Sequence, residues 1–139
     1  IGEEKALKFL EDMGKNMGLM QGKMLQSQLR RKKVKRITPS IAGSLASGVL
    51  AGLGIVTEKL EESLEKMSYK ITNCPVYEAA KLMGLDPEIV CRHSAVPFMN
   101  TIVKQIDPNL SYELEKYRLG PDGYCQESIV LKKEAVIVR

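Results

Sequence analysis

The sequence has few of the residues that build nucleic-acid-binding surfaces. It contains no tryptophan, only five tyrosines and two phenylalanines, and one histidine among 139 residues. Its 21 basic residues are nearly matched by 17 acidic ones, so the formal net charge is only +4. Because nucleic-acid-binding domains usually show a clustered basic excess, we expect no nucleic-acid partner.

Disulfides and familiar catalytic motifs are also missing. Three cysteines are an odd number, no two form a CxxC pair, and no apolar signal segment leads the sequence. This combination disfavours a secreted disulfide framework and predicts a reducing, cytoplasmic location. The sequence also lacks a phosphate-binding loop, an HExxH motif and a GxSxG motif, so no motif-defined enzyme class is indicated.

The first thirty residues have the pattern of one long amphipathic helix, with apolar residues at steps of three and four. We expect this apolar stripe to be core, as is usual for methionines at such spacing. Glycines also recur every fourth residue, and each costs a helix roughly 1 kcal/mol relative to alanine. That cost predicts a close approach to another helix. The stripe comprises Leu10, Met13, Met17, Met20 and Met24, and the glycines are Gly14, Gly18 and Gly22.

A basic run over residues 30–36 and the helix-breaking Thr38-Pro39-Ser40 predict a junction to a second helix. Residues 37–56 carry no charge over about the length of a membrane span. Serines and glycines dilute the apolar character of this segment, so we expect a buried helix and consider membrane contact unlikely. Small residues again recur every fourth position, which predicts that the two helices pack closely, within one chain or across a homodimer. This second ridge is Ser44, Gly48 and Gly52.

The second half alternates between helix and strand signals. Residues 58–70 are ambiguous, and we expect a strand only over residues 68–73. Prolines at positions 75 and 87 predict two helix starts, the second helix reaching residue 106 with a break at Pro97. Strands are expected over residues 110–119, 124–131 and 135–138, the first two joined by the turn at residues 120–123.

The expected fold is therefore α+β. It has an antiparallel sheet, an N-terminal pair of long helices, and further helices packed on one face. We expect residues 1–56 to form the helical pair and residues 57–139 the α+β part, within one folding domain.

Candidate chemistry concentrates between residues 71 and 130, which hold every cysteine and the only histidine. Thiolate and imidazole ligands together suit zinc or another divalent metal, so Cys91, His93 and Cys125 are candidate metal ligands. The plain alternative is that each cysteine is a buried structural residue, a common fate of unpaired cysteines.

A nucleophilic role is the other chemical alternative. Cys74 stands at a predicted helix start, and His93 or the helix dipole would activate its thiolate to attack an electrophilic C=N carbon. A carboxylate on the neighbouring strands would then serve as general base. The candidates for this base are Glu113, Glu115 and Glu127, and we favour Glu115 with Cys74 and His93 as a catalytic group.

The second half resembles the L-2-amino-thiazoline-4-carboxylic acid hydrolase family, which is similar in turn to small-molecule-binding domains of the 4-vinyl reductase type. The likeness lies in the order and spacing of cysteines and turns, together with one strand. These residues are Cys74-Pro75, Gly84, Cys91, Asp107-Pro108, the strand from Tyr112 to Tyr117, Gly123 and Cys125.

This resemblance implies a dimeric α+β fold in which helices cover one face of an antiparallel sheet. It also implies that the segment from Leu60 to Met67 is the first strand of a hairpin, against its helical spacing. In zinc-bearing relatives of the vinyl reductase type, two further ligands lie between the positions matching Cys91 and Cys125. This sequence has Leu114 and Tyr117 at those positions, so His93, Glu113 or Glu115 would have to complete a zinc site.

For hydrolase relatives, the implied reaction is the opening by water of a cyclic amidine-type ring, a cleavage of a carbon–nitrogen bond. The substrate carries a carboxylate, which Arg92, Lys116 or Arg118 would bind. The leading function hypothesis is thus a small-molecule-binding domain of the vinyl reductase type, or a hydrolase of this kind. The alternative is a non-enzymatic ligand or metal sensor, or a dimeric assembly module.

Overall fold

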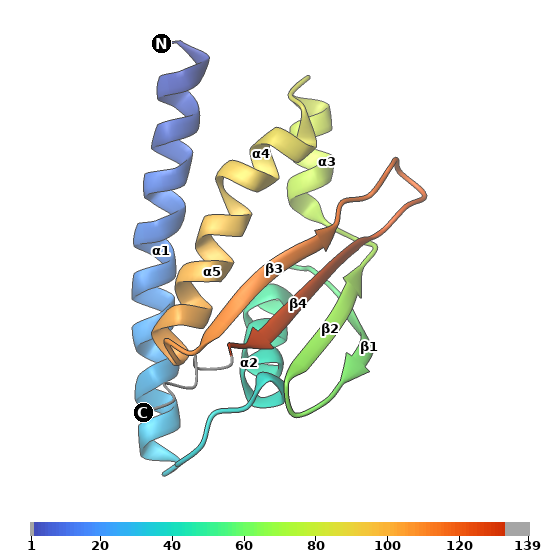
Figure 1. Cartoon of the computed structure of the whole chain (residues 1–139). Coiled ribbons are helices and arrows are strands. Elements are labelled where there is room, and N and C mark those ends of the chain that lie inside the picture. Colours follow the sequence, from blue (N-terminus) through green and yellow to red (C-terminus); the bar gives the residue numbers. More distant parts are fainter. Residues whose placement is uncertain (1, 133–139) are drawn as a thin grey trace, which may run out of the picture.

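The computed structural model describes residues 2–132 and begins with one long helix. Helix α1 spans Glu3–Arg31, with two glutamates in its first turn and two arginines in its last. This charge order favours the helix because its amino end carries partial positive charge and its carboxyl end partial negative charge. Figure 1 shows α1 running alongside α5.

The glycine ridge of α1 contacts α5 (Ala95–Ile106), and not the second helix as expected. A methyl group placed on Gly14 would lie 2.7 Å from the carbonyl oxygen of Ser94, and one on Gly22 would lie 2.5 Å from the Cβ of Gln105. The missing side chains therefore let two helix backbones meet, which offsets the conformational cost of the glycines.

The prediction that the methionine stripe of α1 is core was wrong. The buried face of α1 consists of the glycines with Leu25 and Leu29. The stripe lies on another face and is largely exposed, with Met20 at 71% and Met24 at 58%. Its exposed members are Met13, Met17, Met20 and Met24, whereas Leu10 is partly buried, and the neighbouring Phe9 is exposed as well.

Helix α2 (Pro39–Gly52) covers part of the sheet with a different face from the one we expected. Thr38 caps it by accepting a hydrogen bond from the Ile41 N–H at 3.2 Å. Ala42, Gly43 and Ala46 are buried, and a methyl group on Gly43 would collide with the Met67 sulfur. The predicted ridge points away from this contact: Gly48 has no described side chain within 4 Å of its Cβ position.

The ambiguous segment after α2 forms a hairpin, as the family resemblance implied, but residues 60–67 hold the end of its first strand, its turn and the start of its second strand. Strand β1 spans Thr57–Glu62 and strand β2 spans Lys66–Ile71. Ser63 closes the turn, since its N–H donates to the Lys66 carbonyl at 2.7 Å and its hydroxyl oxygen accepts from the Lys66 N–H at 3.1 Å. Strand pairing thus overrides the helical spacing of the leucines.

Three helices follow, and the first two begin at the predicted prolines. Helix α3 spans Pro75–Leu82 and is followed by Gly84, whose φ of +71° suits glycine. Helix α4 spans Pro87–His93 behind the cap Asp86. The break before α5 falls at Ser94 and not at Pro97, because proline in the first turn of a helix costs no intrahelical hydrogen bond.

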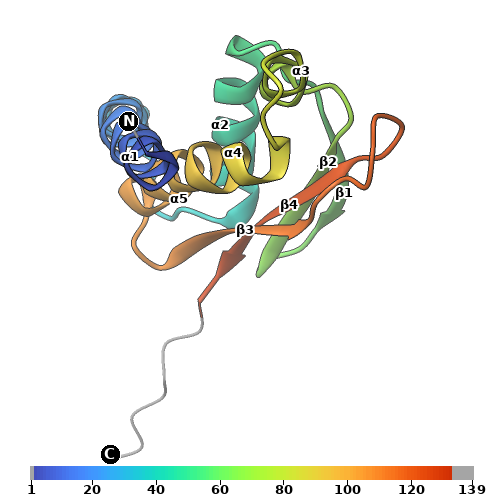
Figure 2. The ribbon, with the colours of Figure 1, turned by 90° about the horizontal axis from the view of Figure 1, so that it is seen from above.

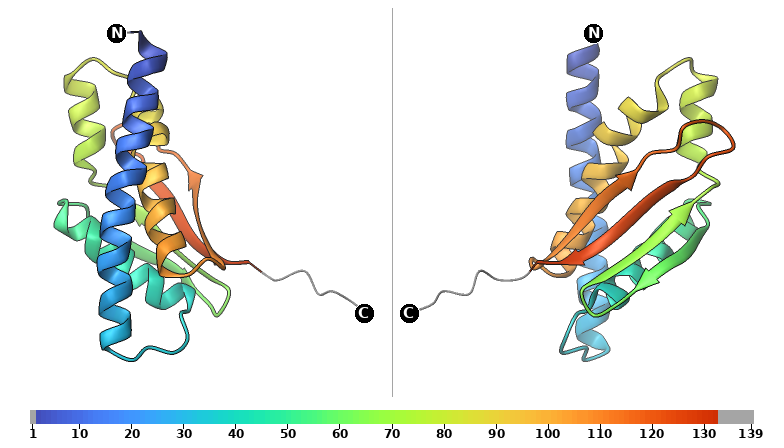
Figure 3. Two further views of the ribbon diagram at one scale, coloured as in Figure 1. Left: turned by 90° about the vertical axis from the view of Figure 1, so that its left-hand side faces the viewer. Right: turned by 45° about the vertical axis from the view of Figure 1, so that its right-hand side comes forward.

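Strands β3 (Leu110–Lys116) and β4 (Cys125–Leu131) complete an antiparallel sheet in the order β1-β2-β4-β3. Strand β3 ends earlier than expected, after a register shift between Leu114 and Lys116. The predicted strand at 135–138 lies outside the described residues. Figures 2 and 3 show the helices on one face of the sheet, which confirms the predicted α+β architecture.

The buried core lies between these two layers. It draws Leu29 and Leu50 from the first 56 residues, and Tyr69, Met99 and Ile129 from the remainder. Among residues 2–132, no helix is both long and apolar enough to cross a membrane.

Candidate functional site

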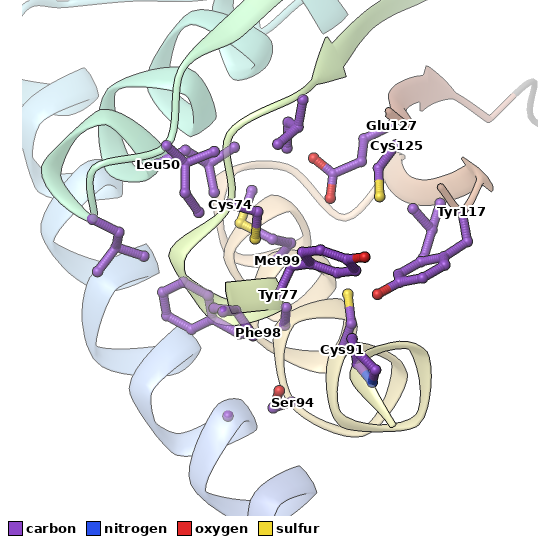
Figure 4. A pocket seen from close by; sticks show the side chains of 18 of the residues that line it. Leu50, Cys74, Tyr77, Cys91, Ser94, Phe98, Met99, Tyr117, Cys125 and Glu127 are labelled. Atoms are coloured by element: carbon purple, nitrogen blue, oxygen red, sulfur yellow. The ribbon is translucent and has the colours of Figure 1, made fainter. Parts of the chain in front are cut away.

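A pocket lies between the helices and the sheet, near the carboxyl end of β3 (Figure 4). Its cavity volume is about 210 Å³, and α1, α3, α4, α5 and the sheet all contribute to its walls. The lining is almost entirely apolar, including Leu50, Ile71, Phe98, Met99 and Leu114. All three cysteines and one carboxyl group complete it, and these are Cys74, Cys91, Cys125 and Glu127.

Strand alternation places two of these groups. Cys125 and Glu127 are two residues apart on β4, so both side chains face the helices. In the ladder, Glu127 pairs with Tyr69 on β2 and with Leu114 on β3. The single acidic group of the pocket is therefore built into the middle of the sheet.

Helical spacing places Cys91. Asp86 caps α4 by accepting a hydrogen bond from the Glu88 N–H at 2.9 Å. From that start, Pro87, Cys91 and Ser94 fall on one helical face, and all three line the pocket. Figure 4 shows the sulfur of Cys91 directed into the pocket, across from Cys125 and beside the hydroxyl of Tyr117.

Cys74 occupies the corner between β2 and α3, immediately before Pro75. It is the N-cap residue of α3, and within the described chain its side chain makes no capping hydrogen bond. Cys74, Cys91 and Cys125 are all free thiols. The structure thus gathers the three cysteines around one cavity, as their confinement to one stretch of the sequence suggested.

Glu127 is the main polar group of the pocket and is only 6% exposed. The Tyr112 hydroxyl donates a hydrogen bond to its Oε1 atom. Its Oε2 atom has no hydrogen-bond partner of good geometry among the described residues, and neither does the nearby Tyr69 hydroxyl. Burial raises the pKa of Glu127 to about 7, although the two tyrosine hydroxyls act to lower it.

The same environment keeps the thiols of Cys91 and Cys125 protonated. Burial, with a smaller effect from Glu127, raises the pKa of Cys91 to about 12. Burial also raises the pKa of Cys125, against hydrogen bonding to the Arg118 backbone. Since the thiolate is the reactive form, neither of these cysteines is a strong nucleophile at neutral pH.

Arg118 reaches the pocket wall, and each of its three side-chain nitrogens makes a structural hydrogen bond. Its guanidinium donates to the carbonyl oxygens of Gly120, Thr72 and Pro121, at 3.0, 3.0 and 2.6 Å. It also stacks 4.1 Å from the ring centre of Tyr77. Arg118 therefore fastens the β3–β4 loop to the strand end and to α3.

Four other predicted site residues lie apart from the cysteines. The His93 ring Nδ1 lies 2.8 Å from the Ile89 carbonyl oxygen, and His93 is not among the pocket-lining residues. Arg92, on the exposed side of α4, donates to Glu88 at 2.8 Å. Lys116 stacks 3.9 Å from the ring centre of Tyr124.

Glu115 points to the face of the sheet that the helices leave uncovered. It lies 2.6 Å from the Lys66 ammonium and accepts a hydrogen bond from the Ser128 hydroxyl at 2.9 Å. The hydrogen bond from Lys66 is the main reason that the pKa of Glu115 is lowered. The structure therefore does not assemble Cys74, His93 and Glu115 into one group.

The predicted metal ligands are only partly brought together. Cys91 and Cys125 line the same pocket, as expected, but His93 does not join them. Across residues 2–132, no three histidine, cysteine, aspartate or glutamate side chains are arranged to hold a metal ion.

Sequence reasoning missed the two tyrosines beside Glu127. Tyr69 and Tyr112 lie on strands separated by β4, so only the strand order β2-β4-β3 brings them to one carboxyl group. The alternation of apolar and polar residues along the predicted strand did place Tyr112 on its apolar face. That alternation was the one signal in the sequence that pointed to Tyr112.

No family model matches the chain, and no curated protein matches it by sequence. Its fold is similar to the crystal structure of trafficking protein particle complex subunit 3 from Naegleria fowleri, covalently bound to palmitic acid. The TM-score is 0.53 at 15% sequence identity, and the match covers 91% of this chain and 82% of that one. This likeness establishes a shared fold.

Proposed function

We propose that this chain is a small-molecule-binding domain whose pocket takes a largely apolar ligand, such as a single alkyl or acyl chain. The observation that carries the proposal is an apolar cavity lined by all five helices of the described chain and by the sheet. Ligand pockets are typically concave, mostly apolar and supplied with a few polar groups. The similar trafficking subunit is described as holding palmitic acid, which makes a fatty chain the first ligand to test here.

Chain-length dependence tests this proposal. Linear alcohols of increasing length are titrated against an uncharged fluorescent probe bound to the protein. Each buried methylene contributes about 0.8 kcal/mol, so affinity is expected to rise about fourfold per added carbon until the cavity is full. Affinity that is independent of chain length would contradict an enclosed apolar pocket.

A matched pair of variants locates the site. Ala95→Phe places a ring on the pocket wall, whereas Ala79→Phe adds the same ring at an exposed position on α3 that does not line the pocket. We expect the first variant to lose probe binding and the second to retain it. A second filling variant, Val76→Phe, guards against a folding defect, and urea midpoints report the stability of all three.

Hydrolysis of a 2-amino-thiazoline carboxylate remains a second proposal, supported by the three thiols that line the pocket. The separate positions of His93 and Glu115 favour binding without turnover. Ring opening of this substrate, measured with the wild type and with Cys74→Ser, separates the two proposals. Turnover lost in the variant would favour the hydrolase, and the absence of turnover at saturating protein would contradict it. Elemental analysis of protein purified without chelator tests zinc in the same samples.

Assembly of two copies through α1 is the third proposal, and its support is the exposed apolar stripe. The exposed apolar residues of α1 follow one another at steps of four, four, three and four, so their spacing is nearly the same in both directions; they are Phe9, Met13, Met17, Met20 and Met24. Such a stripe is self-complementary about a twofold axis near Met17. The glycine ridge of α1 does not serve this purpose, because α5 occupies it.

Charge selects an antiparallel arrangement of the two copies. The first ten residues of α1 contain four acidic and two basic side chains, whereas its last nine contain three basic ones. An antiparallel pair therefore sets the acidic end of each helix beside the basic end of the other. Light scattering should give a dimer for the wild type and a monomer for Met20→Glu, with Gln21→Glu as the charge-matched control. A monomeric wild type at high concentration would contradict this proposal.

A further inference from the structure

The pocket has a distinct polar end. Glu127 stands at one wall beside Cys125, and Figure 4 shows its carboxyl group directed toward the cavity. The Tyr112 hydroxyl engages Oε1, while Oε2 has no well-formed hydrogen bond within the described chain. A buried polar atom without a partner destabilises the folded chain, because it has lost its hydrogen bonds to water. A ligand atom that supplies the missing hydrogen bond restores part of that stability.

No free cation balances this carboxyl group among the described lining residues. Arg118 is the one basic side chain on the wall, and its donors are directed to three backbone carbonyls. The two other basic residues once considered as carboxylate binders, Arg92 and Lys116, do not line the cavity. An anionic ligand head would therefore enter an apolar space that already holds an acid, and the one cation on its wall has donors directed to backbone carbonyls.

We propose that the pocket selects its ligand by the charge of the head group, accepting an apolar chain that ends in an uncharged hydroxyl group placed against Glu127. This inference rests on the proposed binding function and specifies its ligand class. It replaces the carboxylate-bearing substrate that the family resemblance implied.

The chemistry of Glu127 explains the preference for a neutral head. A bound chain displaces water and so favours the neutral form of the buried carboxyl group. A protonated carboxyl group offers one O–H donor together with acceptor oxygens. A hydroxyl group both donates and accepts, so it satisfies Oε2 in either protonation state. An ammonium head would require an ionised Glu127. The attraction between two buried charges only roughly compensates for the free energy lost when both are removed from water.

Three ligands with one chain length test the proposal. Decanol, decanoate and decylamine are titrated against the full chain by calorimetry. We expect decanol to bind about tenfold more tightly than either charged ligand, the discrimination that one buried hydrogen bond or one unpaired charge supplies. Decanoate or decylamine binding as tightly as decanol would overturn the proposal.

Two substitutions assign the effect to Glu127. Glu127→Leu removes the polar partner, so decanol should lose about tenfold in affinity, whereas Glu127→Gln should retain its binding within a few-fold. Decanol affinity unchanged in Glu127→Leu would also overturn the proposal.

The outcomes separate the two levels of inference. If no ligand of the series binds and the fluorescent probe is not retained, the proposed binding function itself fails. If all three bind equally and Ala95→Phe abolishes all three, the binding function stands and head-group selection fails. The ranking by the wild type needs no variant, so a variant that misfolds leaves the test decisive.

Discussion

Gly18 on α1 and Phe98 on α5 lie at backbone contact: a methyl group on Gly18 would stand 2.7 Å from the Phe98 carbonyl oxygen. The same group would lie 2.8 Å from the Cβ atom of Thr101. Neither is the far end of a flexible side chain, so the helices themselves would have to separate. This contact fixes α1 against α5, and α1 supplies one wall of the pocket.

The first prediction concerns this helix contact. Gly18→Ala should lower the free energy of unfolding by about 1–3 kcal/mol, because overpacking exceeds the gain in helix propensity. Gly48→Ala on α2 is the control, since no described side chain lies near its Cβ position. The control should be neutral or stabilising by up to about 1 kcal/mol. Urea denaturation measures both variants, and equal effects would show that the helices are not held in close contact.

The second prediction concerns pH. Burial raises the pKa of Glu127 from its ordinary 4.5 to about 7, so between these values the folded chain binds more protons than the unfolded chain. Its contribution to stability is therefore complete below pH 4.5, and is lost as the pH rises toward 7. Above pH 7 the loss reaches about 3 kcal/mol.

Glu127→Gln isolates this contribution. Unfolding free energies of the wild type and the variant are measured from well below pH 4.5 to above pH 7, a range that brackets both pKa values. Their difference should change in favour of the variant as the pH rises. A difference that is independent of pH would mean that Glu127 titrates normally in the folded chain.

The third prediction concerns thiol reactivity. Burial raises the pKa of Cys91 to about 12, so its thiolate is scarce at neutral pH. Alkylation of Cys91 by iodoacetamide should be at least about a hundredfold slower in the folded chain than in urea, as judged by peptide mass spectrometry. Bound decanol should slow it further because the sulfur faces the cavity. Equal alkylation rates in the folded and unfolded chains would contradict a buried Cys91 thiol with a raised pKa.

The fourth prediction concerns Arg118. Arg118→Lys removes the planar fork that binds three carbonyl groups and the stacking on Tyr77. We expect a loss of about 2–3 kcal/mol in unfolding free energy, since lysine cannot reproduce that geometry. Arg92→Lys, which alters only an exposed ion pair with Glu88, should cost less than about 1 kcal/mol. Similar losses of unfolding free energy in both variants would contradict the role of Arg118 in holding the β3–β4 loop.

The sequence predicted elements where local chemistry decides the structure. Asp86 with Pro87 predicts a helix start, and Gly84 predicts a helix end. The structure confirms both, because each signal depends only on the residues of its own turn. The buried face of α1 was chosen wrongly, because methionines and glycines recur at the same spacing. Which set is buried depends on what approaches the helix, and only tertiary structure supplies that.

The site was predictable only in part. The three cysteines were expected in one region, and they do surround one cavity. Glu127 was merely one of three candidate carboxylates, because its distinction comes from strand order. Glu115 was favoured instead, but alternation along β3 and the register shift after Leu114 place it on the opposite face.

Strand β1 limits how this sheet can associate with other chains. Five of its six residues are exposed, and four of these are charged: Glu58, Lys59, Glu61 and Glu62. A foreign strand that paired with β1 would have to bring these charges into close contact with its own side chains, which discourages edge-to-edge growth. The charges of β1 therefore discourage aggregation at this edge of the sheet.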